Sequence, residues 1–380
     1  MCSCCRRPCH ILLPLLLPLL PLLFLYPSAA PRVKRPAPLP LRFRYDGTFK
    51  ILQVADMHFG NGLITRCRDV ELSEAAWCSD LNTTRFLKRM IQAEDPDLVV
   101  FTGDNIFGSS ATDAAESLFQ AFRPVMESRT PWAAILGNHD QESTMTRGEL
   151  MSFISLMDYS ISQVNPSTVE PTKIDGFGNY DVTVKGAFGS ELSNTSIFSL
   201  YFLDSGDREM VNGFKTYGYI KESQLAWLRR TSQELQANFQ APALAFFHIA
   251  IPEVRDLWFK EFIGHYQEGV ACSSVNSGVL KSLVSMGDVK AVFLGHDHLN
   301  DFCGEIDGIW FCYGGGFGYH GYGRAHWPRR ARVISASLRR GKRNWLGIEA
   351  IRTWKRLDDG KLSKIDDQVL WRDDEVEGLD

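Results

Sequence analysis

Polar residues that can bind metals or carry protons follow short apolar runs at several points in the sequence. Residues 52–55 precede Asp56 and His58, residues 99–101 precede Asp104, and residues 133–136 precede Asn138, His139 and Asp140. Further along the chain, residues 244–247 precede His248, and residues 291–294 precede His296 and His298. Open α/β sheets bind ligands beyond the carboxyl ends of their strands, so we expect these side chains to meet at one edge of a sheet. Each element alone would fit an ordinary turn or a structural histidine. Their joint occurrence favours a metal or catalytic cluster.

The donor types in this set point to a particular chemistry. Imidazole, carboxylate and amide groups, without a thiolate, suit Fe, Zn and Mn. Two such ions about 3.5–4 Å apart can lower the pKa of a water held between them.

The elements that must position these residues can be read from the apolar pattern. Strands are predicted at 49–55, 97–102 and 132–136, and helices at 83–93 and 114–126. This alternation indicates parallel βαβ units and an α/β fold. A helix is predicted at 222–237, and further strands at 180–184, 197–203, 243–247, 289–294, 309–312, 331–337 and 348–354. No internal repeat or linker divides the chain, so a single domain over residues 47–355 is predicted, followed by a C-terminal extension over 356–380.

The amino-terminal segment has the features of a secretory signal peptide over residues 1–30. Arg6 and Arg7 precede an apolar run at 11–25, and small residues follow at 28–30. The alternative, a membrane anchor, needs roughly 20 apolar residues, more than this run contains. Residues 31–46, rich in Pro and Arg, then form a linker. We therefore expect a secreted protein without a membrane span after cleavage, with the vacuole as the alternative destination.

Cysteine usage agrees with an oxidising compartment. Outside the signal segment, the spacing suggests the pairs Cys67–Cys78 and Cys303–Cys312 and leaves Cys272 as a free thiol. The alternative is a set of five reduced cysteines. Asn82 and Asn194 begin glycosylation sequons. The net charge of −4 provides no basic excess, so a nucleic-acid partner is not expected.

The ordered motifs resemble those of the calcineurin-like metallophosphoesterase superfamily over roughly residues 48–320. A closer resemblance is to a small group of atypical plant purple acid phosphatases, carried by GDNIF at 103–107, GNHDQES at 137–143, GHDH at 295–298 and FGY at 317–319. The resemblance implies a four-layer α/β/β/α sandwich and two-metal hydrolysis of phosphate esters, with phosphomonoesters preferred. The alternatives are a phosphodiesterase and a catalytically silent member that binds a phosphate or a partner.

Carried over residue by residue, the resemblance also implies a role for each motif position. Asp56, His58 and His298 would bind one metal; Asn138, His248 and His296 would bind the other; and Asp104 would bridge the two. A hydroxide between the metals would attack phosphorus, while His139 assists the leaving group and Asp140 orients His139. Asn138, His139 and His320 are the predicted substrate-binding residues.

One position departs from the purple enzymes and generates a prediction about colour. Their tyrosinate ligand lies three residues after the bridging Asp, where this chain has Phe107. The visible band of those enzymes is charge transfer from phenolate to Fe(III), which a phenylalanine cannot supply. We therefore expect protein loaded with iron under oxidising conditions to be colourless to pale, and Phe107→Tyr alone to leave it so because His58 occupies the first site. An intense phenolate band in the unmodified protein would refute this ligand set.

Overall fold

The computed structural model describes residues 34–166 and 174–373. The predicted signal peptide, the first residues of the linker and the last residues of the C-terminal extension lie outside this part of the chain. Among the described residues, no helix is long and apolar enough to cross a membrane.

A six-stranded sheet is built around three parallel strands, β2 (Thr48–Val54), β3 (Leu98–Thr102) and β4 (Trp132–Ile135). Helices α2 (Asp80–Glu94) and α3 (Ala114–Ser128) connect them. Every residue of β3 and β4 is buried, as is usual for parallel strands covered on both faces. The predicted βαβ units are therefore present.

Three long antiparallel strands extend this sheet beyond β2. They are β14 (Arg330–Arg340), β15 (Trp345–Leu357) and β16 (Lys364–Arg372). The predicted domain boundary at residue 355 falls inside β15, and β16 lies within the segment predicted as an extension. The sheet thus includes residues that the apolar pattern alone did not assign to it.

The second sheet has eight strands. Its four central strands run parallel: β6 (Ser196–Phe202), β9 (Ala243–Phe246), β11 (Val289–Leu294) and β13 (Ile309–Tyr313). Its outer strands are β1 (Leu41–Arg42), β5 (Tyr180–Lys185), β12 (Cys303–Ile306) and β10 (Phe262–Ile263).

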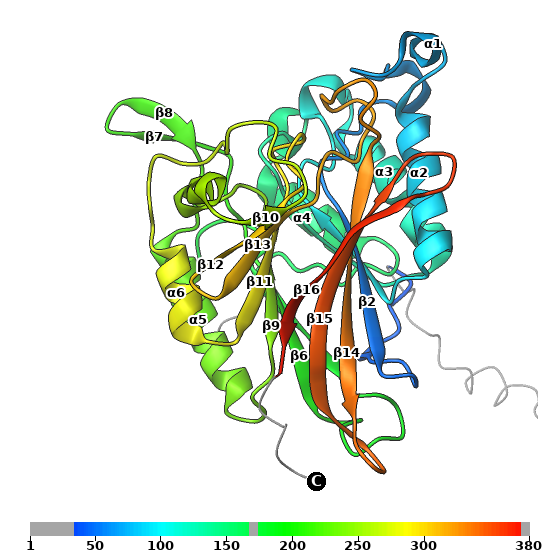
Figure 1. Ribbon diagram of the computed structural model, residues 1–380. Helices are drawn as coiled ribbons and strands as arrows, with labels where there is room; N and C mark the ends of the chain where they lie inside the picture. Colours follow the sequence, from blue (N-terminus) through cyan, green and yellow to red (C-terminus); the bar gives the residue numbers. More distant parts are fainter. Residues whose placement is uncertain (1–33, 167–173, 374–380) are drawn as a thin grey trace, which may run out of the picture.

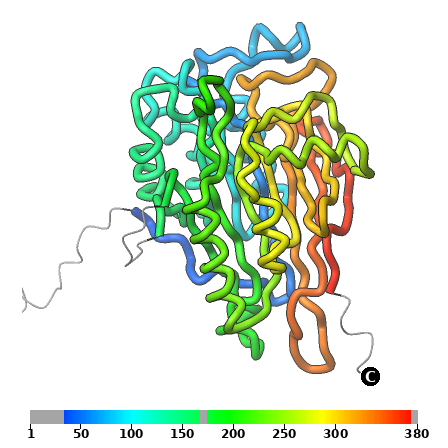
Figure 2. The backbone as a smooth tube through the Cα atoms, turned by 90° about the vertical axis from the view of Figure 1, so that its left-hand side faces the viewer, coloured from blue at the N-terminus to red at the C-terminus, as the bar shows by residue number. Residues whose placement is uncertain are grey.

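The two sheets face each other and form the middle layers of a sandwich (Figure 1). Helices α2 and α3 cover the outer face of the six-stranded sheet. Helices α5 (Glu222–Gln236) and α6 (Val279–Met286) cover the outer face of the eight-stranded sheet (Figure 2). Hydrogen bonds join the sheets: Gln53 donates to the Leu294 carbonyl (2.9 Å) and Tyr180 to the Ala134 carbonyl (2.8 Å). The predicted four-layer α/β/β/α sandwich is confirmed.

The remaining elements lie outside the two large sheets. Strands β7 (Arg208–Val211) and β8 (Phe214–Tyr217) form a separate hairpin. The other helices are α1 (Leu72–Ala75), α4 (Arg147–Leu156) and the 3-10 helices η2 (Gly62–Ile64), η3 (Gly108–Ser110), η4 (Asp140–Glu142) and η5 (Pro252–Phe259). The apolar pattern predicted none of these elements.

Helix α2 begins earlier than the predicted start at residue 83. Ser79 is its N-cap: the Ser79 hydroxyl accepts a hydrogen bond from the Leu81 amide (3.4 Å), and the Asn82 side chain accepts one from the Ser79 amide (3.4 Å). This capping box satisfies amide groups that have no partner within the helix. Asn82, the first residue of one sequon, is therefore engaged in the first turn of the helix.

Both predicted disulfides are present, Cys67–Cys78 and Cys303–Cys312, and Cys272 is a buried free thiol. The first disulfide closes the loop that carries α1. The second joins paired residues of β12 and β13.

A buried charge cluster fastens the loop after β11 to the six-stranded sheet. The carboxylate of Asp301 pairs with Lys355 (2.7 Å) and with Arg330, and its main-chain carbonyl accepts hydrogen bonds from Lys355 (2.9 Å) and Arg332 (2.7 Å). Asp301, Arg332 and Lys355 have no measurable exposure. Burial alone would raise the pKa of Asp301, but Lys355 and Arg330 hold it well below its usual range.

Removal of this carboxylate should strongly destabilise the protein. Asp301→Ala would leave the buried Arg330 without its anion, although Lys355 would keep Asp366 (2.6 Å). Breaking a buried ion pair by removing one partner typically costs about 3–5 kcal/mol of unfolding free energy. Because the folded pKa of Asp301 is depressed, its contribution is present above the unfolded value of about 4 and is lost as pH falls below it. Denaturant titrations from pH 7 to pH 3 measure both effects.

The control for this prediction is Asp367→Ala, which removes the carboxylate of an exposed ion pair with Arg352. Such pairs contribute about 0–1 kcal/mol. Equal losses of unfolding free energy in the two variants would show that the buried cluster contributes no more to stability than an exposed ion pair.

Candidate metal centre

The predicted ligands are brought together by strand ends from both sheets. Strands β2, β3 and β4 of the six-stranded sheet lead to Asp56, His58, Asp104 and Asn138, and strands β9 and β11 of the eight-stranded sheet lead to His248, His296 and His298. Each of these residues is at most 8% exposed. The cluster therefore lies where the edges of two sheets meet, rather than along the single edge that the sequence suggested.

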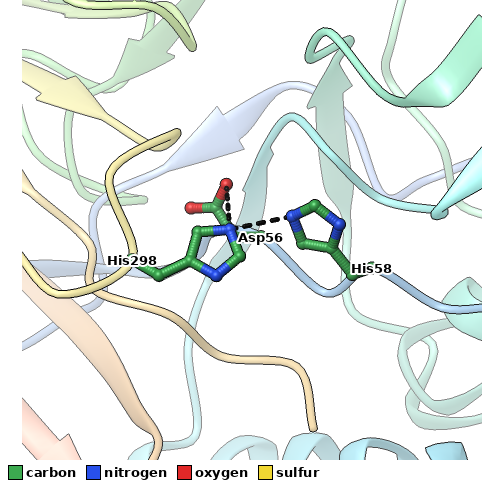
Figure 3. A group of neighbouring side chains, drawn as sticks. All are labelled: Asp56, His58 and His298. Carbon is green, nitrogen blue, oxygen red and sulfur yellow. Dashed lines mark hydrogen bonds and ion pairs between the residues drawn. The ribbon is translucent and has the colours of Figure 1, made fainter. Parts of the chain in front are cut away.

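The first group of donors comprises Asp56, His58 and His298 (Figure 3). The Nε2 atoms of His58 and His298 lie 2.8 Å apart, and Nε2 of His298 lies 3.6 Å from a carboxylate oxygen of Asp56. The Nδ1 atom of His298 donates to the Tyr322 carbonyl (2.8 Å), so the Nε2 lone pair faces the group.

The second group comprises Asp104, His248 and His296. His248 Nδ1 donates to the Thr102 carbonyl (2.8 Å), which directs its Nε2 atom toward Asp104 (3.2 Å) and the side-chain oxygen of Asn138 (3.3 Å). His296 Nε2 is buried and has no hydrogen-bond partner. Asn138 thus joins this group as predicted.

Asp104 lies between the two groups. Its Oδ2 atom is 3.4 Å from Nε2 of His58 in the first group and 3.2 Å from Nε2 of His248 in the second. Its Oδ1 atom accepts a hydrogen bond from the main-chain amide of His139 (2.8 Å). One carboxylate oxygen therefore faces both sets of donors, as a bridging ligand must.

The protonation of these groups suits positive ions. Burial lowers the pKa of His298 to about 3, and also lowers the pKa values of His58 and His296 well below their usual range. These imidazoles are neutral and offer lone pairs. Burial raises the pKa of Asp56, and the charge of Asp104 adds to this effect. Cations placed between the two carboxylates would remove the repulsion, so the residues present fit two metal ions.

Burial favours the neutral form of His248, but the charge of Asp104 outweighs it and raises the pKa of His248 to about 9. The negative field that attracts a proton to this ring would equally attract a metal ion. A bound cation would displace that proton, because metal-bound histidine is neutral.

The main chain is strained at the ligands. Asp56, His58, Asp104 and His296 adopt positive φ angles of 57°, 46°, 48° and 79°. This conformation costs roughly 1–2 kcal/mol for each residue other than glycine. Strain of this kind concentrates at functional sites. Gly137 has a different constraint, since a Cβ atom there would lie 2.1 Å from Oδ1 of Asp104.

His139 lies beside the first group, with its ring 5.3 Å from that of His58. Asp140 was predicted to orient His139 but does not contact its ring; its carboxylate accepts hydrogen bonds from the amides of Ile106 (3.0 Å) and Gly137 (2.7 Å). Glu142 holds His139 instead, at 2.9 Å from Nδ1. Asp140 therefore shapes the ligand loops, because two strand-end turns converge on it.

His320 was predicted to bind substrate, yet both of its ring nitrogens have protein partners. Nδ1 lies 2.7 Å from the Arg66 carbonyl and Nε2 lies 3.0 Å from the Ser110 hydroxyl. The side chain packs edge-on against Phe107. These contacts give His320 a structural function in connecting η3 to the residue just before the Cys67–Cys78 loop.

Phe107 lies in the wall of the centre. Its ring is 5.2 Å from His58 and 4.8 Å from His139, and the Arg68 guanidinium lies 5.0 Å above it. The position aligned with the purple-enzyme tyrosinate thus faces the metal ligands, with a hydrocarbon ring in place of a phenolate.

Sequence reasoning missed four further residues of the centre: Glu142, Tyr217, Tyr322 and Arg208. Tyr217 packs edge-on against His296 at 4.5 Å, and the Tyr322 ring stacks on His298 at 3.8 Å. Glu142 was within the quoted 137–143 stretch, three residues after His139. Arg208 and Tyr217 belong to the unpredicted β7–β8 hairpin, which carries no motif.

Comparisons with known proteins identify the family. The model of the calcineurin-like phosphoesterase family matches residues 49–300. The chain belongs to this family. Among its relatives are two Arabidopsis thaliana proteins, "Probable inactive purple acid phosphatase 28", 66% identical over 90% of this chain and 88% of the relative, and "Probable inactive purple acid phosphatase 29", 53% identical over 87% and 88%.

Two further proteins extend the comparison. "Phosphatase DCR2" of Saccharomyces cerevisiae is 34% identical over 86% of this phosphoesterase, which matches 56% of the length of the yeast protein. A dimetal phosphatase from Danio rerio has a similar structure, with a TM-score of 0.53 and 18% identity over 86% of this chain and 99% of that chain. This likeness confirms the metallophosphoesterase fold.

Metal content should separate the ligands from His139. Asp104→Asn removes the shared charge and should reduce the bound metal to below two ions per chain, because both groups use the same oxygen. His139→Ala should retain both ions, because this ring is outside the two groups of donors. Metal analysis of the purified variants after identical loading tests this, and equal metal loss in both variants would assign His139 to the ligands.

Proposed function

We propose that this phosphoesterase hydrolyses phosphate esters with two bound metal ions and prefers phosphomonoesters. The observation that carries the proposal is the position of Asp104, one oxygen of which faces two separate groups of buried donors. A single structural metal would need only one such group. Fe with Zn, or Mn, suits the mixed imidazole and carboxylate donors.

When bound, such ions would neutralise the charge of the phosphate and activate water as the nucleophile. The protein contributes the remaining steps. Asn138, whose side-chain oxygen lies 3.3 Å from Nε2 of His248, would help to bind a phosphate oxygen. His139 is tethered at Nδ1 by Glu142, and no part of the described chain occupies its Nε2. In the imidazolium form, Nε2–H can therefore pass its proton to the leaving oxygen, which leaves the ring neutral with its Nδ1–H still on Glu142.

A second candidate function is supported by the names of the relatives. Two relatives at 66% and 53% identity are called probable inactive purple acid phosphatases. A catalytically silent member of the family would bind a phosphate or a partner without turnover. Against this, all seven predicted metal ligands and His139 are retained and converge in space. A diesterase remains the alternative within the active class.

We also propose that the protein is secreted. The sequence of residues 1–30 and the two disulfides support this, since disulfides persist in oxidising compartments. Fusion of residues 1–30 to a reporter would test it: secretion of the reporter supports the proposal, and retention inside the cell contradicts it.

Turnover should depend on both the metals and His139. Protein stripped by a chelator and reloaded with Fe, Zn or Mn should hydrolyse a chromogenic phosphomonoester faster than a chromogenic diester. His139→Ala should lower kcat by about 10²–10⁴-fold, because a general acid typically contributes this much. Rates measured from pH 4 to pH 9, with metal content determined in parallel, provide the test.

If no metal supports hydrolysis of either ester at any pH while two ions are bound, the silent alternative holds. If the diester reacts faster, the chain is a diesterase. An unchanged rate in His139→Ala would remove this residue from the mechanism.

A further inference from the structure

The β7–β8 hairpin forms a wall of the metal centre although it belongs to neither large sheet. It projects beyond the eight-stranded sheet (Figure 1). Tyr217 at its base packs against the ligand His296 (4.5 Å). Two residues outside the hairpin contact it: Lys221 pairs with Glu209 of β7 (2.6 Å), and the Ser274 amide donates a hydrogen bond to the Thr216 hydroxyl of β8 (2.8 Å). Its position beside the ligands is therefore fixed.

Arg208, the first residue of this hairpin, reaches toward the ligand loop of the opposite sheet. Its Nη1 atom donates to the carbonyl of Asn138 (3.2 Å) and to the carboxylates of Asp207 (2.8 Å) and Glu142 (3.3 Å). The other oxygen of Glu142 holds His139. Glu142 thus connects the guanidinium to the imidazole that faces the reaction.

The guanidinium has unused hydrogen-bonding capacity. The hydrogen bonds and ion pairs of the Arg208 side chain in the described structure all involve Nη1, so the N–H groups of Nε and Nη2 have no protein partner there. The side chain is 46% exposed. An arginine held on one side by a ligand loop and open to solvent on the other is suited to a charged oxygen that arrives from solvent.

We propose that Arg208 binds a phosphate oxygen of the substrate and thereby selects dianionic monoesters over monoanionic diesters. The inference rests on the proposed function and specifies its substrate class. A phosphomonoester carries a charge of about −1.5 to −2 at pH 7, whereas a diester carries one negative charge and presents an alkyl or aryl group where the monoester has a third oxygen. A guanidinium at this position should bind the more highly charged monoester more tightly than the diester. Glu142 acts as a positioning residue for both Arg208 and His139.

The test uses metal-loaded full-length protein and three variants: Arg208→Ala, Arg208→Lys and Lys215→Ala. Lys215 lies on the same hairpin, is exposed, and makes no contact with the centre in the described structure, so Lys215→Ala is the control for lost charge. Binding of inorganic phosphate is measured by calorimetry, and KM and kcat are measured for a monoester and a diester. Metal content is determined for each variant.

Arg208→Ala should weaken phosphate binding and raise the monoester KM by about 10–100-fold, the value expected for one charge-assisted hydrogen bond. The diester KM should change less than about twofold. Arg208→Lys should bind phosphate better than Arg208→Ala but less well than the unmodified protein, because lysine keeps the positive charge but lacks the paired donors of the guanidinium. Lys215→Ala should behave as the unmodified protein, and all variants should keep two metal ions.

Three results would overturn the inference. The first is an equal rise of KM for both esters in Arg208→Ala, and the second is an equal loss of phosphate binding in Lys215→Ala. The third is a loss of bound metal in Arg208→Ala. Absence of phosphate binding to the unmodified, metal-loaded protein would also overturn it. If the protein binds phosphate through Arg208 but hydrolyses neither ester, the proposed turnover fails while the assignment of Arg208 as a phosphate-binding residue stands.

Discussion

The structure depends on one electrostatic constraint: carboxylate oxygens and imidazole nitrogens point at one another in a buried space. Asp104 lies at the centre of this arrangement, 3.2–3.4 Å from two histidines of different groups. Without positive charge between them, these donors repel one another or must take up protons. The left-handed main chain at four ligands adds further cost. Without metal, the folded protein therefore has a less favourable free energy at the ligand cluster, and ion binding would remove this cost. Metal affinity is thus coupled to the stability of the sheet ends that carry the ligands.

Two sheets are needed to satisfy that constraint. The strand ends of the six-stranded sheet supply Asp56, His58, Asp104 and Asn138, and those of the other sheet supply three histidines. Relative sliding of the sheets would separate the groups, so the sheets must be held together close to the centre. Asp301 does this only three residues after His298, through Arg330 and Lys355 of the opposite sheet. The buried charge cluster thus helps to keep the two groups of metal ligands in place.

The sequence predicted the parts of this site that are tied to strand ends, because apolar strands and the residues that end them are local features. The resemblance to the metallophosphoesterases implied the position of Asp104 between the two groups, and the spacing of the cysteines suggested both disulfides. Glu142 was overlooked because its function depends on a single turn of η4, which places it rather than Asp140 against His139. Arg208 and Tyr217 could not be predicted, since the hairpin that carries them is short and exposed and meets the centre only through tertiary packing.

Colour and hydrolysis rest on different residues in this phosphoesterase. In the purple enzymes a phenolate both binds iron and produces the visible band, but here His58 occupies the first group and Phe107 packs beside it. The phenyl ring cannot donate electrons to a metal, yet it contacts the rings of both His58 and His139. A phenylalanine at this position therefore keeps an apolar wall beside both histidines but supplies neither a ligand nor a chromophore. The predicted lack of colour and the proposed turnover are consequently independent of each other.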